Sequence, residues 1–374
     1  MAALADLTDW MDDHTGPHIV WYVKRLAAND TLATRAKQAG PYISKHFLFD
    51  VFPNLNRPDA ENPDEWFELR IDSHCDVRNA RAVWYNNRQR GHSRNEARIT
   101  NLGGAQSALL DPDSTGSLAV FAFHRGAGGK APVCHVWVCD QEVEADIVEE
   151  RIGPVEPGHP VIWGIDENIL PGFITPTRAS CWLTPDEIPP AWLIRFPTGA
   201  EIVRRTVELC PLLGRNVDIR LLKRRDCEFE IFRSVEEAVE LPVIRAGFHT
   251  LDEFMVRAQS ILQRRKARSG RSLELHTREI FLEENLREGE QFQHQVQSEP
   301  GRRPDFLFPS AAAYKNREFP DTWLRMLAVK TTCKDRWRQI LNEARRIERK
   351  HLLTLQRGVS ERQFLEMSEA QVPL

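Results

Sequence analysis

The chain has 374 residues, of which 41% are hydrophobic and 28% are charged, and its formal net charge is −4 at pH 7. This length and apolar content predict about two domains with substantial cores, and the lack of a spanning apolar run or signal peptide argues against a membrane protein. The seven cysteines are scattered without a CxxC pair, which favours a reducing, cytoplasmic setting over a disulfide framework.

The N-terminal half contains short β-rich runs separated by Gly, Asn and Asp clusters: AVWYNN (82–87), SLAVFAFH (117–124) and CHVWVCD (134–140). This pattern predicts a barrel-like, all-β domain. Cys134, His135 and Cys139 lie within the last run, where the spacing and the strand alternation favour buried small residues over a zinc site.

Two polar segments of this half are candidate DNA-contacting arms, with a solvated loop as the alternative interpretation. The first contains Arg94, Asn95, Glu96 and Arg98, and the second contains Arg35, Lys37 and Tyr42.

Residues 153–197 contain nine of the 23 prolines, as expected of a hinge between domains. We therefore predict an N-terminal domain over 1–180, with the hinge continuing to about 195, and a second domain over 181–374. The second domain is expected to contain helices over 199–210, 228–240 and 251–266, and then helix, strand, strand and helix. This order predicts an α/β core.

Local charge is more informative than the net charge, because one face makes the contacts with phosphates. Residues 263–271 hold five basic groups in nine positions, and Arg264 is a candidate phosphate contact. Residues 141–150 hold five acids in ten.

Residues 303–309 and 324–332 both alternate like half-buried strands, which would place Asp305 and Lys330 on neighbouring strands. A carboxylate that binds Mg²⁺ beside an ammonium that offsets phosphate charge is suited to phosphodiester hydrolysis. In the general PD-(D/E)xK nuclease pattern an acid lies two residues before the Lys, but here that residue is Ala328. A second carboxylate must come from elsewhere, and Glu343 on the next predicted helix is the candidate.

That helix is predicted from a stripe of apolar residues at helical spacing: Trp337, Ile340, Leu341, Ala344 and Ile347. Its N-terminal end carries Lys334, Asp335 and Arg336. Cations donate to guanine O6 and N7, and an Asp accepts from cytosine N4, so this triplet suits adjacent G·C pairs in the major groove.

Six segments resemble the EcoRII-type restriction endonucleases, which read sites beginning CC and ending GG. They are KRLAANDT (24–31), SRNEARIT (93–100), RFPTG (195–199), RRKARSGRSLELH (264–276), PDFLFPS (304–310) and VKTTCKDRWRQILNEA (329–344).

The resemblance implies a B3-like DNA-binding domain followed by a PD-(D/E)xK nuclease domain that continues beyond Leu374 in the family. It also implies a catalytic set of Asp305, Lys330 and Glu343, with Glu274 as a further acid that could bind metal. Tyr314 falls near this centre, and Arg225 matches a residue of the pocket that receives a flipped base.

Together with these residues, the resemblance predicts a homodimeric type II restriction endonuclease that cuts a duplex site of the CCWGG kind with Mg²⁺. Its N-terminal domain would bind a second copy of the site and inhibit cleavage until then. Two alternatives are a catalytically silent, sequence-specific DNA-binding protein and a structure-selective repair nuclease.

Overall fold

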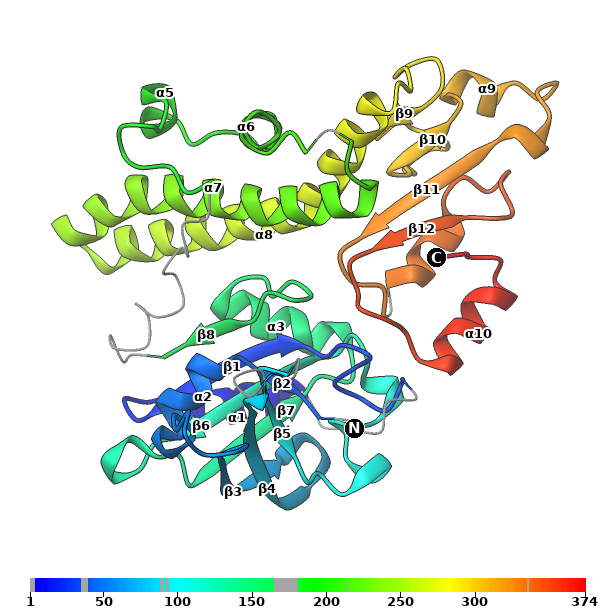
Figure 1. Cartoon of the computed structure of the whole chain (residues 1–374). Coiled ribbons are helices and arrows are strands. Elements are labelled where there is room, and N and C mark those ends of the chain that lie inside the picture. Colours follow the sequence, from blue (N-terminus) through cyan, green and yellow to red (C-terminus); the bar gives the residue numbers. More distant parts are fainter. Residues whose placement is uncertain are drawn as a thin grey trace. The chain divides into compact units, whose positions relative to one another are not determined.

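The computed structural model describes residues 4–34, 40–87, 91, 94–164, 181–212, 214–334 and 336–374. Three candidate residues, Arg35, Lys37 and Asp335, and the expected domain boundary near 180 lie outside these ranges. The chain forms two compact units (Figure 1). The first, here called the sheet unit, comprises Met1–Ile174, Thr332–Arg338 and Thr354–Ala370; the second, the helical unit, comprises Thr175–Thr331, Gln339–Leu353 and Gln371–Leu374.

The sheet unit is built on one eight-stranded sheet with the order β2-β5-β4-β3-β7-β6-β1-β8. Its strands are β1 (Ile19–Arg25), β2 (Tyr42–Ile43), β3 (Asp64–Ile71), β4 (Asp76–Tyr85), β5 (Glu96–Thr100), β6 (Leu118–His124), β7 (Val133–Val138) and β8 (Val161–Trp163). Its helices are α1 (Leu4–Asp13), α2 (Lys45–Val51), α3 (Glu142–Ile152) and α10 (Glu361–Glu369). The β-rich runs of the sequence are therefore strands, and the unit also contains helices that the all-β prediction did not include.

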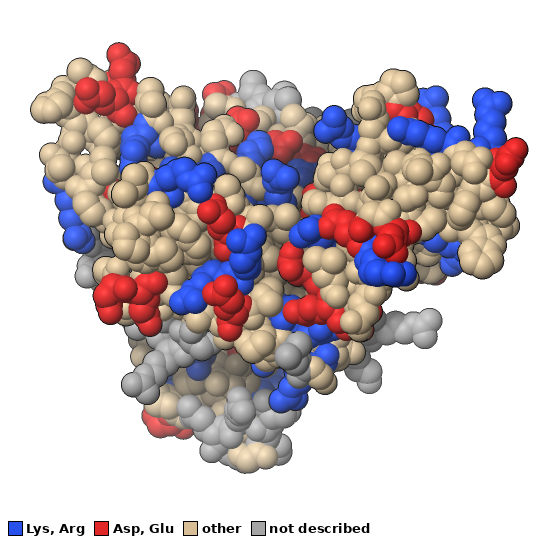
Figure 2. All heavy atoms as spheres, turned by 90° about the horizontal axis from the view of Figure 1, so that it is seen from above, with Lys and Arg blue, Asp and Glu red and all other residues tan. Residues whose placement is uncertain are grey.

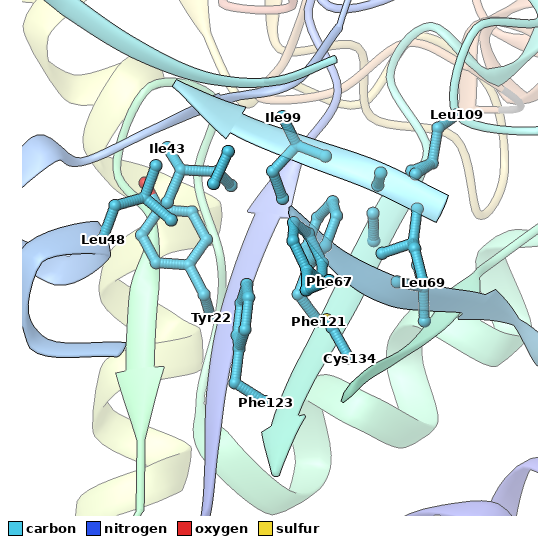
Figure 3. Close-up of a cluster of buried hydrophobic side chains, with 14 of the residues drawn as sticks. Tyr22, Ile43, Leu48, Phe67, Leu69, Ile99, Leu109, Phe121, Phe123 and Cys134 are labelled. Carbon is cyan, nitrogen blue, oxygen red and sulfur yellow. The ribbon is translucent and has the colours of Figure 1, made fainter. Parts of the chain in front are cut away.

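Strand alternation gives this sheet two buried faces. In β6, the side chains of Phe121 and Phe123 enter one apolar cluster, whereas those of Val120 and Ala122 enter another. The first cluster is drawn in Figure 3, where Cys134 of β7 also points among the aromatic rings. The second cluster packs against apolar side chains of α1 and α3. Successive side chains of a strand point to opposite faces of the sheet. A residue buried on one face is therefore followed by one whose side chain points to the other face.

The helical unit contains α5 (Pro190–Ile194), α6 (Gly199–Leu209), α7 (Val217–Ala246), α8 (Leu251–Glu283) and α9 (Ala311–Lys315). The helices expected over 228–240 and 251–266 are each part of a longer helix. α6 begins at a capping box in which the Thr198 hydroxyl accepts from the Glu201 amide, and the Thr250 side chain caps α8 in the same way.

Ion pairs of buried glutamates on α7 with arginines of α8 link the two helices. Glu236 accepts from Arg265 at 2.7 Å and Glu240 from Arg264 at 2.8 Å, while Glu228 binds Arg268 at 2.8 Å. On the face shown in Figure 2, basic and acidic side chains lie interspersed. The basic run 263–271 therefore supplies three of its five cations to pairing inside this unit. The sequence prediction treated the run as a phosphate-binding surface because it did not place the glutamates of α7 opposite it.

A second sheet of the helical unit has the order β12-β11-β10-β9. Its strands are β9 (Gln293–His294), β10 (Phe306–Phe308), β11 (Arg325–Lys330) and β12 (His351–Thr354). β10 and β11 are antiparallel, with Phe306 opposite Leu327. The two strands predicted around 303–309 and 324–332 are therefore present and adjacent.

The structure contains a disulfide that the composition did not lead us to expect. Cys181 and Cys227 form a disulfide within the helical unit, with a Cα–Cα distance of 5.2 Å. They lie 46 residues apart in sequence, so no local spacing indicated the pair. None of the described helices is both long and apolar enough to cross a membrane.

Candidate active site

Asp305 and Lys330 meet at the ends of β10 and β11, as the sequence predicted. The Asp305 Oδ2 atom accepts from the Lys330 ammonium at 3.1 Å and from the Val329 amide at 2.7 Å. Its Oδ1 atom accepts from the Gln295 side chain at 3.1 Å. Three donors therefore fix a carboxylate that is only 7% exposed. Gln295 was missed from the sequence because it lies in the β9–β10 connection, ten residues from its partner.

Glu343 is the second carboxylate of this centre. Burial raises its pKa; the nearby Lys330 ammonium opposes this rise, and the Asp305 carboxylate adds to it. Its Oε2 atom is buried and has no hydrogen-bond partner. An unpaired buried carboxylate oxygen is costly, and a hard divalent cation is a ligand that would satisfy it. The arrangement can thus hold a metal ion beside a cation suited to phosphate.

The helix predicted to carry Glu343 is absent from the described structure of 336–347. A short 3₁₀ helix, η8 (Arg336–Asn342), ends just before Glu343, and Ala344 has a φ of +43°. The amide of Arg345 donates to the Glu299 carboxylate at 2.9 Å, and that of Arg346 donates to the Tyr314 hydroxyl at 3.1 Å. These side-chain acceptors take N–H groups that an α-helix would have used internally. The predicted helix with Arg336 at its N-terminal end and Glu343 further along was therefore wrong, although most of the apolar stripe is buried.

Tyr314 and Glu274 both contact other side chains near the centre. The Tyr314 hydroxyl donates to Glu299, and burial with this partner raises its pKa to about 12. It thus remains protonated at neutral pH and holds the segment that follows Glu343. Glu274, on α8, binds His294 of β9, whose ring stacks on Phe306.

Among the described residues, Glu274, Asp305 and Glu343 do not form a group of three ligand atoms close enough to share one metal ion. The assignment of Glu274 as a direct metal ligand therefore stays a prediction.

The two described base-reading candidates are engaged inside the sheet unit. Lys334 donates to the Ser117 hydroxyl. The Arg336 guanidinium pairs with Glu142 at 2.7 Å and with Asp146 at 3.5 Å, both on α3. The sequence had identified the acidic run 141–150 only as a charge contrast, because nothing in its spacing indicated a partner almost 200 residues away.

Arg225 is buried on α7 and donates to the Ser272 hydroxyl of α8 at 2.8 Å. Ser272 lines a cavity of about 340 Å³ whose wall also includes Phe196, Phe232 and Arg264. Arg264 itself lies over the Phe196 ring at 4.0 Å while pairing with Glu240, so the structure gives it internal contacts where we expected phosphate contact. Arg225 does not line this cavity, but it donates to Ser272, which does.

The described arm residues also have internal contacts. The Arg98 guanidinium is buried over the Tyr42 ring at 3.4 Å and donates to the Gly40 carbonyl at 3.2 Å. Asn95 accepts from the Trp84 indole at 2.9 Å. The remaining two, Arg94 and Glu96, form a partly exposed ion pair at 3.5 Å. Arg98 and Tyr42 thus brace β2 against β5, a role that neither the arm nor the solvated-loop interpretation anticipated.

Comparisons with known proteins match both halves of the chain. Residues 15–167 match the family described as "Restriction endonuclease EcoRII, N-terminal", and residues 232–374 match "EcoRII C terminal". The type II restriction enzyme EcoRII of Escherichia coli is 42% identical over 372 residues, which cover 98% of this chain and 89% of that enzyme.

A crystal structure of the UbaLAI restriction endonuclease B3 domain with cognate DNA aligns with 42% of this chain and 97% of its own. It has 15% identity and a TM-score of 0.30, a similarity too low to support an argument.

These matches place the chain in the class of site-specific restriction endonucleases, nucleases whose partner is DNA. It belongs to the EcoRII family of type II restriction enzymes.

Proposed function

We propose that Asp305, Lys330 and Glu343 hydrolyse one phosphodiester bond in each strand of a duplex site that begins CC and ends GG. The observation that carries this proposal is the 3.1 Å contact between Asp305 and Lys330 beside a buried Glu343 oxygen without a partner. Water is the nucleophile. Lys330 would donate to a phosphate oxygen or orient the water, and it would offset the charge that develops on the phosphate.

The divalent ion that we propose for this centre is Mg²⁺. Asp305 and Glu343 supply hard carboxylate oxygens, which suit Mg²⁺ better than softer metals. When bound, the ion would polarise the phosphate and lower the pKa of a coordinated water. The chain's own contribution is positional: Gln295 and the Val329 amide fix Asp305, and Glu299 with Tyr314 fixes the segment after Glu343.

Base reading and its control form the second part of the proposal. Lys334, Asp335 and Arg336 would donate to guanine and accept from cytosine, and the cavity beside Ser272 would receive a flipped central base, with Arg225 supporting its wall. In the described state, Lys334 donates to Ser117 and Arg336 pairs with the acids of α3. DNA must displace them, so the sheet unit would inhibit the enzyme until a second copy of the site binds to it.

We further propose a homodimer, in which one active site serves each strand, and a B3-like mode of DNA binding for the N-terminal domain. Two domains divided near residue 180 remain our proposal for the functional division of the chain.

The test is cleavage of a plasmid that contains CCWGG sites, with Mg²⁺ or with EDTA. We expect double-strand cuts whose sequenced ends share one site, and none from Lys330→Ala or Glu343→Gln protein that still binds the site. A wild-type protein that binds specifically without cutting would instead be a silent DNA-binding protein. Cuts without a common sequence would indicate a structure-selective nuclease.

A further inference from the structure

Three histidines converge on the face of the sheet that α1 covers. His124 ends β6, His135 lies on the neighbouring strand β7, and His14 directly follows α1. Each offers a ring nitrogen, and these three atoms lie within 4.8 Å of one another. His14 and His124 share a hydrogen bond of 2.9 Å, and the His14 and His135 rings stack with centroids 4.1 Å apart.

The surroundings of this cluster resemble the outer shell of a metal site. Asp72 Oδ2 lies 2.8 Å from His135 Nδ1 and accepts from the Trp10 indole at 2.7 Å. A carboxylate that accepts a hydrogen bond from Nδ1–H fixes the tautomer in which Nε2 has its lone pair free, which is the arrangement that orients histidine ligands in metalloproteins. The His14 main chain is held as well, because its carbonyl accepts from the Trp21 indole at 2.7 Å.

The cluster has the chemistry of one class of ion. Imidazoles favour zinc and its first-row neighbours over magnesium. In a tetrahedral site with bonds of about 2.0 to 2.1 Å, ligand nitrogens lie about 3.3 Å apart. The three atoms would need to close from separations of up to 4.8 Å, a shift that side-chain rotation at partly exposed rings can supply.

We propose that His14, His124 and His135 form a binding site for a Zn²⁺-class divalent ion, with water in the fourth position and Asp72 orienting His135. The site belongs to the sheet unit and differs in ligand type from the carboxylate centre of Asp305 and Glu343, which belongs to the helical unit. Because His14 follows α1 and the other two ligands lie on β6 and β7, the ion would fasten the N-terminal helix to the sheet.

The experiment uses the full chain, stripped with a chelator and returned to buffer with excess Mg²⁺, which occupies oxygen-ligand sites but not imidazoles. Co²⁺ is then titrated as a spectroscopic probe. We expect one equivalent to give the visible absorption of tetrahedral, nitrogen-ligated cobalt, which one equivalent of Zn²⁺ removes. The same ion should raise the melting temperature, because it binds the folded state.

Three variants test the ligands. His135→Gln should lose the cobalt spectrum, and Asp72→Asn, which keeps all three imidazoles, should weaken binding about 10- to 100-fold. His18→Gln removes an exposed histidine of the same unit and should bind as the wild type does. The absence of tetrahedral cobalt bands in the wild type would overturn the proposal, as would equal bands in His135→Gln. If His135→Gln does not fold, unchanged affinity in Asp72→Asn would count against the site in the same way.

Discussion

Neutralising the acids of α3 that hold Arg336 should activate the enzyme. Glu142→Gln removes the 2.7 Å ion pair, and adding Asp146→Asn removes the one at 3.5 Å. The Arg336 side chain is 35% exposed, so solvent screens both pairs and each contributes about 0.2 to 1 kcal/mol. Together they hold the Arg336 side chain in place by about 0.4 to 2 kcal/mol, and their loss should raise the population in which Arg336 is free about 2- to 30-fold.

The assay is the rate of cleavage of a plasmid with a single site, at equal concentrations of each protein. We expect the double variant to cut faster than the wild type by this factor, and the gain should shrink at high salt, where the wild-type pairs are already screened. Glu150→Gln is the matched control for Glu142→Gln, because it removes one charge from an exposed position of the same helix.

Two results would refute the reasoning. One is an unchanged single-site rate in the double variant. The other is an equal gain in Glu150→Gln, which would show that reduced negative charge on α3 favours DNA in general and that the contacts of Arg336 are irrelevant.

Three further predictions concern stability and reading. Glu343→Gln should raise the melting temperature of the metal-free protein at pH 7, because the folded-state pKa of this carboxyl is raised and its ionisation therefore destabilises the native state. This difference should disappear below the ordinary pKa of Glu, where the carboxyl is protonated in both states; a melting temperature that is no higher at pH 7 would contradict the buried position. Arg336→Ala should reduce the preference for specific over non-specific duplex by about 1 to 3 kcal/mol in binding titrations, and a uniform loss across sequences would make this residue a phosphate clamp. Arg264→Ala should lower the melting temperature by a few degrees, since it removes the pair with Glu240 and the contact with Phe196; an unchanged melting temperature with a flatter salt dependence of DNA binding would restore the phosphate contact predicted from the sequence.

The strands of the nuclease core could be predicted from the sequence because alternation is local. The same alternation placed Asp305 and Lys330 on neighbouring strands, and the structure confirms their contact. The backbone conformation around Glu343 could not be predicted. In place of the expected helix, backbone amides donate to Glu299 and Tyr314, which come from distant segments. Periodicity reports which residues are buried, but it does not report which acceptors compete for a backbone N–H.

The remaining predictions failed for a similar reason, because the sequence does not indicate which distant charges form ion pairs. A run such as 263–271 has the same composition whether its arginines face phosphate or the glutamates of a neighbouring helix. The three histidines were missed for a related reason: His14 and His124 are 110 residues apart, and the zinc pattern considered around His135 was confined to one strand. Of its cysteines, Cys134 enters the apolar cluster on the opposite face of the sheet (Figure 3), and Cys139 is buried in the second apolar cluster.

Residues 332–338 and 354–370 are part of the sheet unit, although they are encoded near the end of the chain. The Gln356 side chain accepts from the amides of Cys333 and Lys334, and Lys334 in turn contacts Ser117. The sheet unit is thus built from both ends of the chain, and this constrains how the family can diversify. A recombination event that joins the N-terminal half of one member to the C-terminal half of another separates residues that have adapted to each other. Viable hybrids should therefore be rare unless the exchanged halves also agree at Ser117, Glu142 and Asp146, so specificity in this lineage should drift by paired point substitutions more readily than by exchange of whole domains.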